Sequence, residues 1–229
     1  MGRIRPRGLW RGSSLGWEFP LAAAETLLER FGTRFRVDEE LLRWLHWHRH
    51  PLPPLPYHRE LIAHADLNQP LADGRRPLPH QRSGARWLLA RRGALLTDEM
   101  GLGKTLTALL AARALVRVVP LRLLVVAPVG LHPHWQREAS AVDLEVCLHS
   151  WARLPSDLPE AGTVMVVDEA HYAQTMQAQR TQALLRLARH PRLRAIWMLT
   201  GTPVRNGRPI QLYPLLAAID HPLARDQRS

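Results

Sequence analysis

The stretch Leu95-Leu96-Thr97-Asp98-Glu99-Met100-Gly101-Leu102-Gly103-Lys104-Thr105-Leu106 decides the fold of this chain. Apolar residues lead into a glycine-containing turn, and Lys-Thr then opens an amphipathic segment. This order is typical of a nucleotide phosphate loop, in which backbone N–H groups and a helix N-terminus face the phosphate oxygens. We expect Lys104 to reach the β- and γ-phosphates and Thr105 to hold Mg²⁺.

Lys104 is the only lysine among 31 basic residues, and all the others are arginine. A flexible ammonium and a planar guanidinium are not interchangeable in a tight phosphate cradle, so the exception falls where chemistry resists replacement. Asp98 stands where the strict phosphate-loop pattern has its first glycine. The order of strand, turn and helix nevertheless favours a phosphate loop over the alternative, a glycine turn before an ordinary helix.

Length and composition bound the class of protein. The 229 residues allow one α/β domain and a small appendage. The sequence contains no long apolar run, so we expect neither a membrane span nor a signal peptide. We therefore expect a cytosolic protein, associated with the nucleoid or the nucleus according to its source. The only cysteine, Cys147, excludes an intramolecular disulfide, and its apolar neighbours predict a buried structural thiol.

The formal net charge of +11 points to polyanionic partners. Residues 1–76 carry a net +3 and residues 77–229 a net +8, so most of the surplus lies in the part with the phosphate loop. An enzyme that also holds a nucleic-acid backbone needs such a surplus. The alternative is that the arginine-rich composition reflects codon bias alone.

Composition shifts divide the chain into four parts. Residues 1–16 form a basic arm, residues 17–65 a small α+β accessory module, residues 66–76 a linker rich in Pro, Gly and Arg, and residues 77–229 an α/β lobe. The tryptophans and arginines of the module suit nucleic-acid binding and a small tryptophan core equally well.

The lobe alternates apolar runs with helical segments, which predicts a parallel β-sheet with helices on both faces. The runs at 163–167 and 195–199 end in polar groups, at the strand ends where such sheets bind ligands. Asp168 stands where a carboxylate can hold Mg²⁺ beside a phosphate loop, and Glu169 can orient the attacking water. The alternative is a surface acidic pair.

Five motifs, quoted below in chain order, resemble those of the first RecA-like lobe of Swi/Snf-type helicase-like superfamily 2 ATPases, over residues 77 to about 219. Within that family the chain is similar to the annealing-helicase branch, because Trp17-Glu-Phe-Pro20 and the helix after it resemble the accessory DNA-recognition module of that branch. The motifs are Leu78-Pro-His-Gln81-Arg-Ser-Gly84, Asp98-Glu-Met-Gly-Leu-Gly-Lys-Thr105, Val126-Ala-Pro-Val-Gly-Leu-His-Pro-His-Trp135, Asp168-Glu-Ala-His171 and Leu199-Thr-Gly-Thr-Pro-Val-Arg-Asn206.

The resemblance implies a role for each motif residue. Gln81 would read adenine through its amide, beside the phosphate-binding residues. Lys104, Asp168 and Glu169 would be catalytic, and Thr105 and Asp168 would hold the metal. His171 would couple the nucleotide site to the next strand end. The remaining implied residues are Gly101, Leu102 and Gly103 for the nucleotide, Thr200 and Thr202 for coupling, and Pro128, Val129, Gly130 and Trp135 for DNA.

The implied function is the ATP-binding lobe of an ATP- and Mg²⁺-using DNA-dependent ATPase that remodels duplex or forked DNA in replication or repair. Such motors need a second lobe with arginine fingers, which are worth about 10³ to 10⁵ in rate. Arg205 and Arg208 are not obvious substitutes. We therefore expect this chain alone to bind ATP and hydrolyse it poorly, the second lobe belonging to another chain or to a longer form of this one.

Two other functions remain open from the sequence. One is a DNA- or protein-binding module with a regulatory, non-hydrolysing nucleotide pocket. The other is a general phosphate-loop phosphotransferase, which would leave Gln81 and the segment 200–203 without a role.

Overall fold

The computed structural model describes residues 9–11, 16–18, 23–31, 37, 39–49, 65–159, 161–204 and 208–224. Most of the basic arm predicted for residues 1–16 and the residue Arg205 lie outside the described residues. The chain forms two compact units, Met1–Pro51 and Leu52–Ser229. None of the helices in the described part has the length and apolar character needed to cross a membrane.

The first unit combines a small hairpin with two helices. Strands β1 (Leu9–Arg11) and β2 (Gly16–Glu18) pair antiparallel. Helices α1 (Ala24–Phe31) and α2 (Glu39–Arg49) are joined by an ion pair of 3.1 Å between Arg49 Nε and Glu25 Oε1. The tryptophan side chains of α2 lie outside the described residues, so both interpretations of the module remain predictions.

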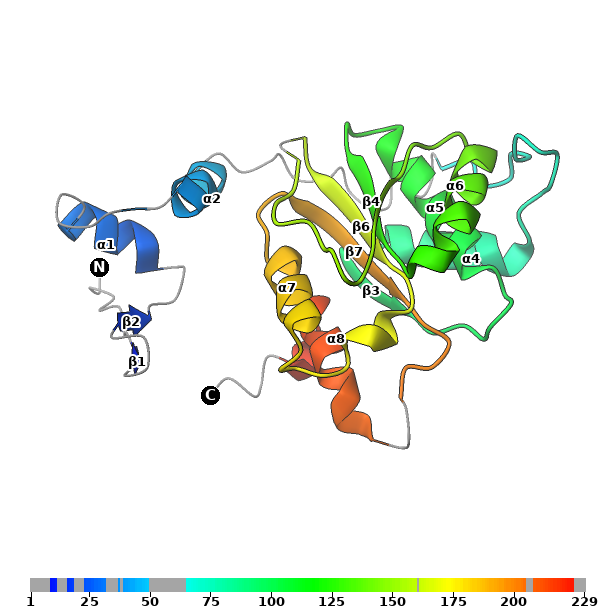
Figure 1. The fold of residues 1–229 in the computed structure, drawn as a ribbon. Coiled ribbons are helices and arrows are strands. Elements are labelled where there is room, and N and C mark those ends of the chain that lie inside the picture. Colours follow the sequence, from blue (N-terminus) through cyan, green and yellow to red (C-terminus); the bar gives the residue numbers. More distant parts are fainter. Residues whose placement is uncertain are drawn as a thin grey trace. The chain divides into compact units, whose positions relative to one another are not determined.

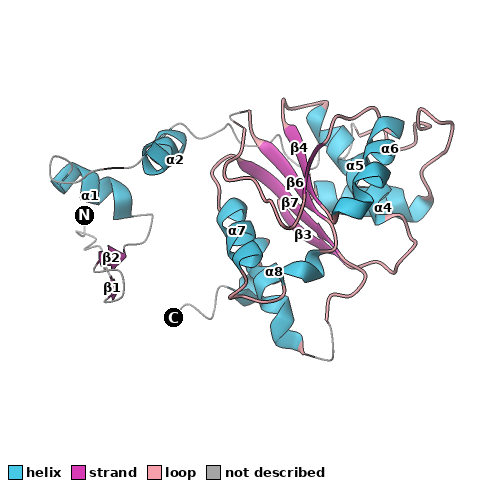
Figure 2. Cartoon of the chain, viewed as in Figure 1, coloured by secondary structure: helices cyan, strands magenta, loops and turns pink. Residues whose placement is uncertain are grey.

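The second unit is built on a five-stranded sheet in which every pair of neighbours is parallel, with the order β3-β7-β6-β4-β5 (Figures 1 and 2). The parallel sheet predicted from the apolar runs is confirmed. The strands are β3 (Gly93–Leu96), β4 (Arg122–Val126), β5 (Cys147–His149), β6 (Thr163–Val167) and β7 (Leu193–Leu199).

Helices cover both faces of this sheet, as Figure 1 shows. Alternate residues of β6 point to opposite faces: Val164 and Val166 join one buried cluster, and Met165 and Val167 join the other. The first cluster packs against α4 (Pro79–Leu89), α5 (Lys104–Val116) and α6 (His132–Ala141), and the second against α7 (Gln179–Ala188) and α8 (Tyr213–Ala218). Short 3₁₀ turns complete the unit at Val129–Leu131, Ala170–Ala173, Pro209–Leu212 and Pro222–Ala224.

Two sequence expectations differ from the structure. The segment 66–76, expected as a linker, packs onto the second unit: Leu67 and Leu71 are buried in its core, and the N–H of Ala72 donates to the carbonyl of Ala141 at 2.8 Å. Cys147 was expected to be buried, but it is exposed. The reason is that β5 is an edge strand with β4 as its single neighbour in the sheet.

Gly93 provides a test of this packing. A Cβ atom at this position would collide with the carbonyl oxygen of Ile219, directly after α8, whereas a Cβ at Gly130 would meet no atom within 4 Å. We expect G93A to lower the free energy of unfolding by about 1–3 kcal/mol, because backbone atoms must move to make room. Urea denaturation of G93A, with G130A as control, measures this difference. Equal midpoints for the two variants would contradict it.

Candidate nucleotide site at the carboxyl edge of the sheet

The strand order brings the predicted motifs together. Because β3, β7, β6 and β4 are consecutive neighbours and all parallel, their carboxyl ends lie side by side at one edge. The phosphate loop follows β3, Thr200 follows β7, Asp168 follows β6, and Pro128 lies just beyond β4. Residues more than 100 positions apart in the chain therefore meet at this edge.

The phosphate loop curves around its own lysine. Lys104 Nζ donates hydrogen bonds to the carbonyl oxygens of Asp98 at 2.8 Å and Glu99 at 3.0 Å. Gly103 has a φ of +74°, and a Cβ there would strike the Gln81 amide. Glycine is therefore required on both conformational and steric grounds. Helix α5 begins at Lys104, so its first N–H groups face the space beyond the loop.

The start of α4 supports this loop. Gln81 is buried, and its Oε1 accepts a hydrogen bond from the backbone N–H of Leu78 at 2.9 Å. His80 Nε2 lies 3.0 Å from the carbonyl oxygen of Leu102, inside the loop. Sequence reasoning missed His80, although it adjoins Gln81. Since the Oε1 of Gln81 is engaged, its amide N–H group is the part that faces Gly103.

Asp168 is held between two tryptophans. Trp135 Nε1 donates to the carboxylate Oδ2 at 2.8 Å, and Trp151 Nε1 donates to the backbone carbonyl at 3.0 Å. The other carboxylate oxygen accepts the N–H of Glu169 at 2.9 Å. Burial raises the pKa of the Asp168 carboxyl, and the bonds from Trp135 and Glu169 oppose that rise. The Trp135 indole and the Glu169 N–H thus favour the ionised form that a metal ligand requires.

Glu169 adopts a left-handed backbone conformation, with φ +48°. For a residue with a Cβ this costs about 1 kcal/mol or more, and such strain gathers at functional sites. The turn directs the carboxylate Oε2 to 3.0 Å from His171 Nδ1. Because a carboxylate only accepts, Nδ1 carries the proton in this arrangement.

The same histidine nitrogen reaches the end of β7. His171 Nδ1 lies 3.4 Å from Thr200 Oγ1 and 3.5 Å from Thr202 Oγ1. The N–H of Thr202 also donates to Thr200 Oγ1 at 3.1 Å. A chain of polar contacts thus joins the carboxylate beside the phosphate loop to the neighbouring strand end. This geometry agrees with the predicted coupling, which remains a prediction.

The expected DNA-contacting residues separate into two groups. Val129 is 66% exposed and Gly130 is also exposed, just beyond the end of β4. Trp135 was expected in the same loop, but it is fully buried. Its position in α6 faces the sheet and its N–H is bonded to Asp168, so it cannot touch DNA. Its contact is with the candidate metal ligand.

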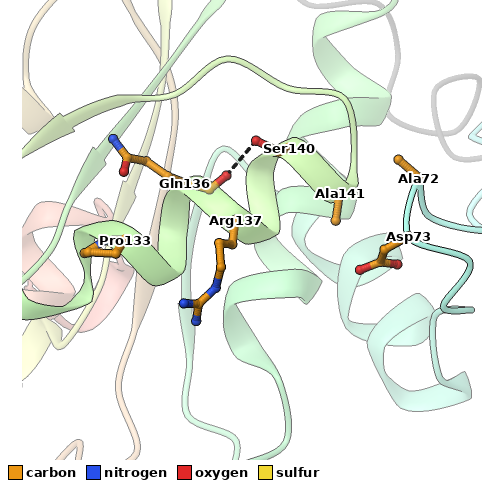
Figure 3. Close-up of a pocket in the computed structure, with 7 residues that line it drawn as sticks. All are labelled: Ala72, Asp73, Pro133, Gln136, Arg137, Ser140 and Ala141. Atoms are coloured by element: carbon orange, nitrogen blue, oxygen red, sulfur yellow. Dashed lines mark hydrogen bonds between the residues drawn. The ribbon is translucent and has the colours of Figure 1, made fainter.

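Two surface hollows lie outside the phosphate loop. One, of about 620 Å³, separates Ala72 and Asp73 from the exposed side of α6 (Figure 3). The other, of about 470 Å³, is lined partly by Arg153 and Arg180. Neither includes a residue of the phosphate loop. The candidate site is therefore defined by the converging strand ends, and neither of these two hollows forms it.

Comparison with known proteins places this arrangement in a family. Residues 80–151, which run from the start of α4 through the phosphate loop to Trp151, match the SNF2-related domain. Over these residues the chain is similar to the SNF2-related domain. The resemblance inferred from the motifs is thereby confirmed at the level of this domain.

The curated relatives belong to the same family. The chain is 28% identical over 187 residues to SWI/SNF-related matrix-associated actin-dependent regulator of chromatin subfamily A-like protein 1 of Xenopus tropicalis, covering 70% of this chain and 19% of that protein. It is 31% identical over 173 residues to the DNA annealing helicase and endonuclease ZRANB3 of Mus musculus, covering 62% and 16%. The chain thus spans less than a fifth of these relatives.

Solved structures support the fold. The Sulfolobus solfataricus SWI2/SNF2 ATPase core, solved in complex with dsDNA, matches with a TM-score of 0.54 at 21% identity, over 69% of this chain and 38% of that one. The UvsW helicase of bacteriophage T4 matches with a TM-score of 0.51 at 15% identity, over 85% and 74%. The second unit therefore has the fold of a RecA-like helicase lobe.

The two tryptophans at Asp168 allow a matched test. We expect W135F to raise the pKa of the Asp168 carboxyl, because the variant loses a hydrogen bond that favours the ionised form. W151F should leave this pKa unchanged, since Trp151 bonds to the backbone carbonyl. A carbon-13 NMR titration of labelled aspartate carboxyls, assigned with D168N, measures both. Identical titration of Asp168 in W135F and the wild type would contradict the assignment.

Proposed function

We propose that the second unit is the ATP-binding lobe of a DNA-dependent ATPase that remodels duplex or forked DNA. The observation that carries the proposal is the meeting of the phosphate loop, Asp168–Glu169 and Thr200–Thr202 at three adjacent strand ends. The SNF2-related domain supports the same reaction class. The dsDNA bound by the Sulfolobus core supports DNA as the partner.

Within this proposal Thr105 and Asp168 hold Mg²⁺. Hydroxyl and carboxylate oxygens are the ligands this hard cation prefers. Each Asp168 oxygen accepts one hydrogen bond, from Trp135 or from Glu169. A carboxylate has about four acceptor positions, so both oxygens keep a lone pair for a metal or its water. The residues therefore fit the ion, which supplies charge neutralisation on the transferred phosphoryl group.

The remaining residues have distinct roles. Lys104 exchanges its two carbonyl contacts for phosphate oxygens, and Gln81 presents its amide N–H to adenine. Glu169 accepts a proton from the attacking water or orients it. His171, which contacts Glu169 and both threonine hydroxyls, transmits a change at the nucleotide to the end of β7.

Full hydrolysis in this proposal needs a second RecA-like lobe. Arginine fingers from such a lobe stabilise the charge of the transition state and are worth about 10³–10⁵ in rate. The alternative function is a regulatory module that binds nucleotide without turnover. The observation that favours it is the engagement of Lys104 by its own loop carbonyls, which nucleotide binding must displace.

Substitution of Lys104 tests nucleotide binding. We expect K104A to weaken ATP binding at least tenfold, because charged hydrogen bonds to phosphate are lost. K104R should also bind poorly, because a planar guanidinium does not fit the space of the ammonium. R137Q removes the same charge from an exposed position on α6 and serves as control. Isothermal titration calorimetry with Mg-ATP measures each affinity.

The catalytic step has its own readout. We expect E169Q to keep wild-type ATP affinity while losing DNA-stimulated turnover, measured as phosphate release at low salt with and without forked duplex. Unchanged ATP affinity in K104A would remove the basis of the proposal. Binding of ATP by the wild type with no turnover under any DNA condition would favour the regulatory alternative.

A further inference from the structure

A cluster of arginines around an exposed tryptophan lies far from the nucleotide site. We call it the arginine–tryptophan patch, and it consists of Arg86, Trp87, Arg91, Arg92 and Arg194. Its residues come from the end of α4, the turn into β3 and the start of β7. Helix α4 begins beside the phosphate loop and its 11 residues extend about 16 Å. The patch is therefore at the amino edge of the sheet.

Three arginines of the patch add exposed positive charge. Arg86, Arg91 and Arg92 are exposed, and none forms an ion pair with an acidic side chain in the described part of the chain. Arg92 donates to the carbonyl of Leu193 at 3.3 Å, which holds it beside β7. Burial and the nearby Arg92 both lower the pKa of Arg194. Like charges held this close favour a polyanion as partner.

An aromatic platform stands within this charge. Trp87 is 37% exposed, and the Arg91 guanidinium lies 4.3 Å from the centre of its ring. Arg91 also donates to the carbonyl of Trp87 at 2.9 Å, which fixes the stack from a second point. The backbone carbonyl of Arg91 accepts a hydrogen bond of 3.2 Å from the indole N–H of buried Trp197, which anchors the Arg91 backbone to the core. The result is a flat, cationic, pre-ordered surface.

We propose that the arginine–tryptophan patch binds single-stranded nucleic acid. Arg86 and Arg92 contact backbone phosphates, and an unpaired base stacks on the Trp87–Arg91 platform. A duplex buries its base faces in its own stack, so the platform selects unpaired nucleotides. The site goes beyond the proposed function, because it is at the opposite edge of the sheet and uses neither ATP nor the loop after β4.

Charge-neutral variants test the phosphate contacts. We expect R86Q/R92Q to weaken binding of fluorescein-labelled (dT)20 about tenfold at low salt and to reduce the slope of log affinity against log salt by about 1.4, which is about 0.7 for each lost contact on a single strand. R137Q/R186Q removes two exposed arginines from α6 and α7 and should leave both quantities near wild type. Equal losses in the two variants would overturn the proposal.

A second comparison tests stacking. The wild type should bind (dT)20 more tightly than an abasic oligonucleotide of equal length, and W87L and R91Q should each reduce that preference, since stacking is worth about 1–3 kcal/mol per base. R91Q keeps Trp87 in place and remains informative if W87L folds poorly. Equal binding of both oligonucleotides by the wild type would show that no base stacks on the platform and would overturn the proposal. Equal competition by polyglutamate would identify a site for acidic protein and would also overturn it.

Crosslinking locates the strand. Irradiation of the wild type with an oligonucleotide containing 5-iodouracil should attach it to the tryptic peptide 87–91, and attachment only elsewhere in the chain would overturn the proposal. K104A should crosslink as the wild type does. The two proposals therefore fail separately: loss of the Trp87 crosslink removes the patch, whereas ATP binding by K104A removes the nucleotide site.

Discussion

The structure depends on one constraint, the parallel register of β3, β7, β6 and β4. Successive residues of β6 are buried on opposite faces, so a shift of one residue would exchange the sets of side chains that face the two helical layers. Such a shift would move buried side chains to the wrong face, and the free energy that this costs fixes where each strand ends. Because the pairs Leu96–Leu199 and Val126–Val167 are held in register, the residues that follow them are brought to one edge. Core packing thus determines the geometry of the candidate site.

Asp168 is a buried carboxylate at this edge that is stabilised by hydrogen bonds. A carboxylate that is nearly enclosed loses the hydration that favours its ionised form. Trp135 compensates directly through the carboxylate, and Trp151 satisfies the backbone carbonyl where the ladder of β6 ends. The two indoles also come from different segments, α6 and the turn after β5. The position of Asp168 is therefore determined by the packed lobe and by its own strand together.

Much of the fold could be predicted from the sequence, because apolar runs and helical periodicity are local signals. The run 163–167 coincides with β6, and the helix expected after the phosphate loop is α5. Strand order is not a local signal. For this reason the run containing Cys147 was expected inside, although β5 is an edge strand.

The candidate site divides in the same way. Spacing within motifs identified Lys104, Asp168 and Glu169, but the partners of these side chains come from distant segments. Trp135 was assigned to a DNA-facing loop because it follows Pro128 closely. Its spacing with Ala139 and Val142 is that of one helix face, and both of those residues are buried beside it, so helical periodicity could have placed it inside. Nothing in the local sequence links it to Asp168, 33 residues away.

The charged residues of the lobe are distributed unevenly between the two edges of the sheet, and the net charge does not show this. The proposed metal-assisted phosphoryl transfer needs carboxylates at the carboxyl edge, where Asp168 and Glu169 lie. The exposed loop at 128–131 has no charged side chain, so it can reach a phosphate only through backbone groups. Arginines instead begin or precede strands at the amino edge, as Arg92 and Arg122 do. A net +8 over residues 77–229 is therefore no measure of phosphate binding at the carboxyl edge, because part of that charge lies at the other end of the same strands.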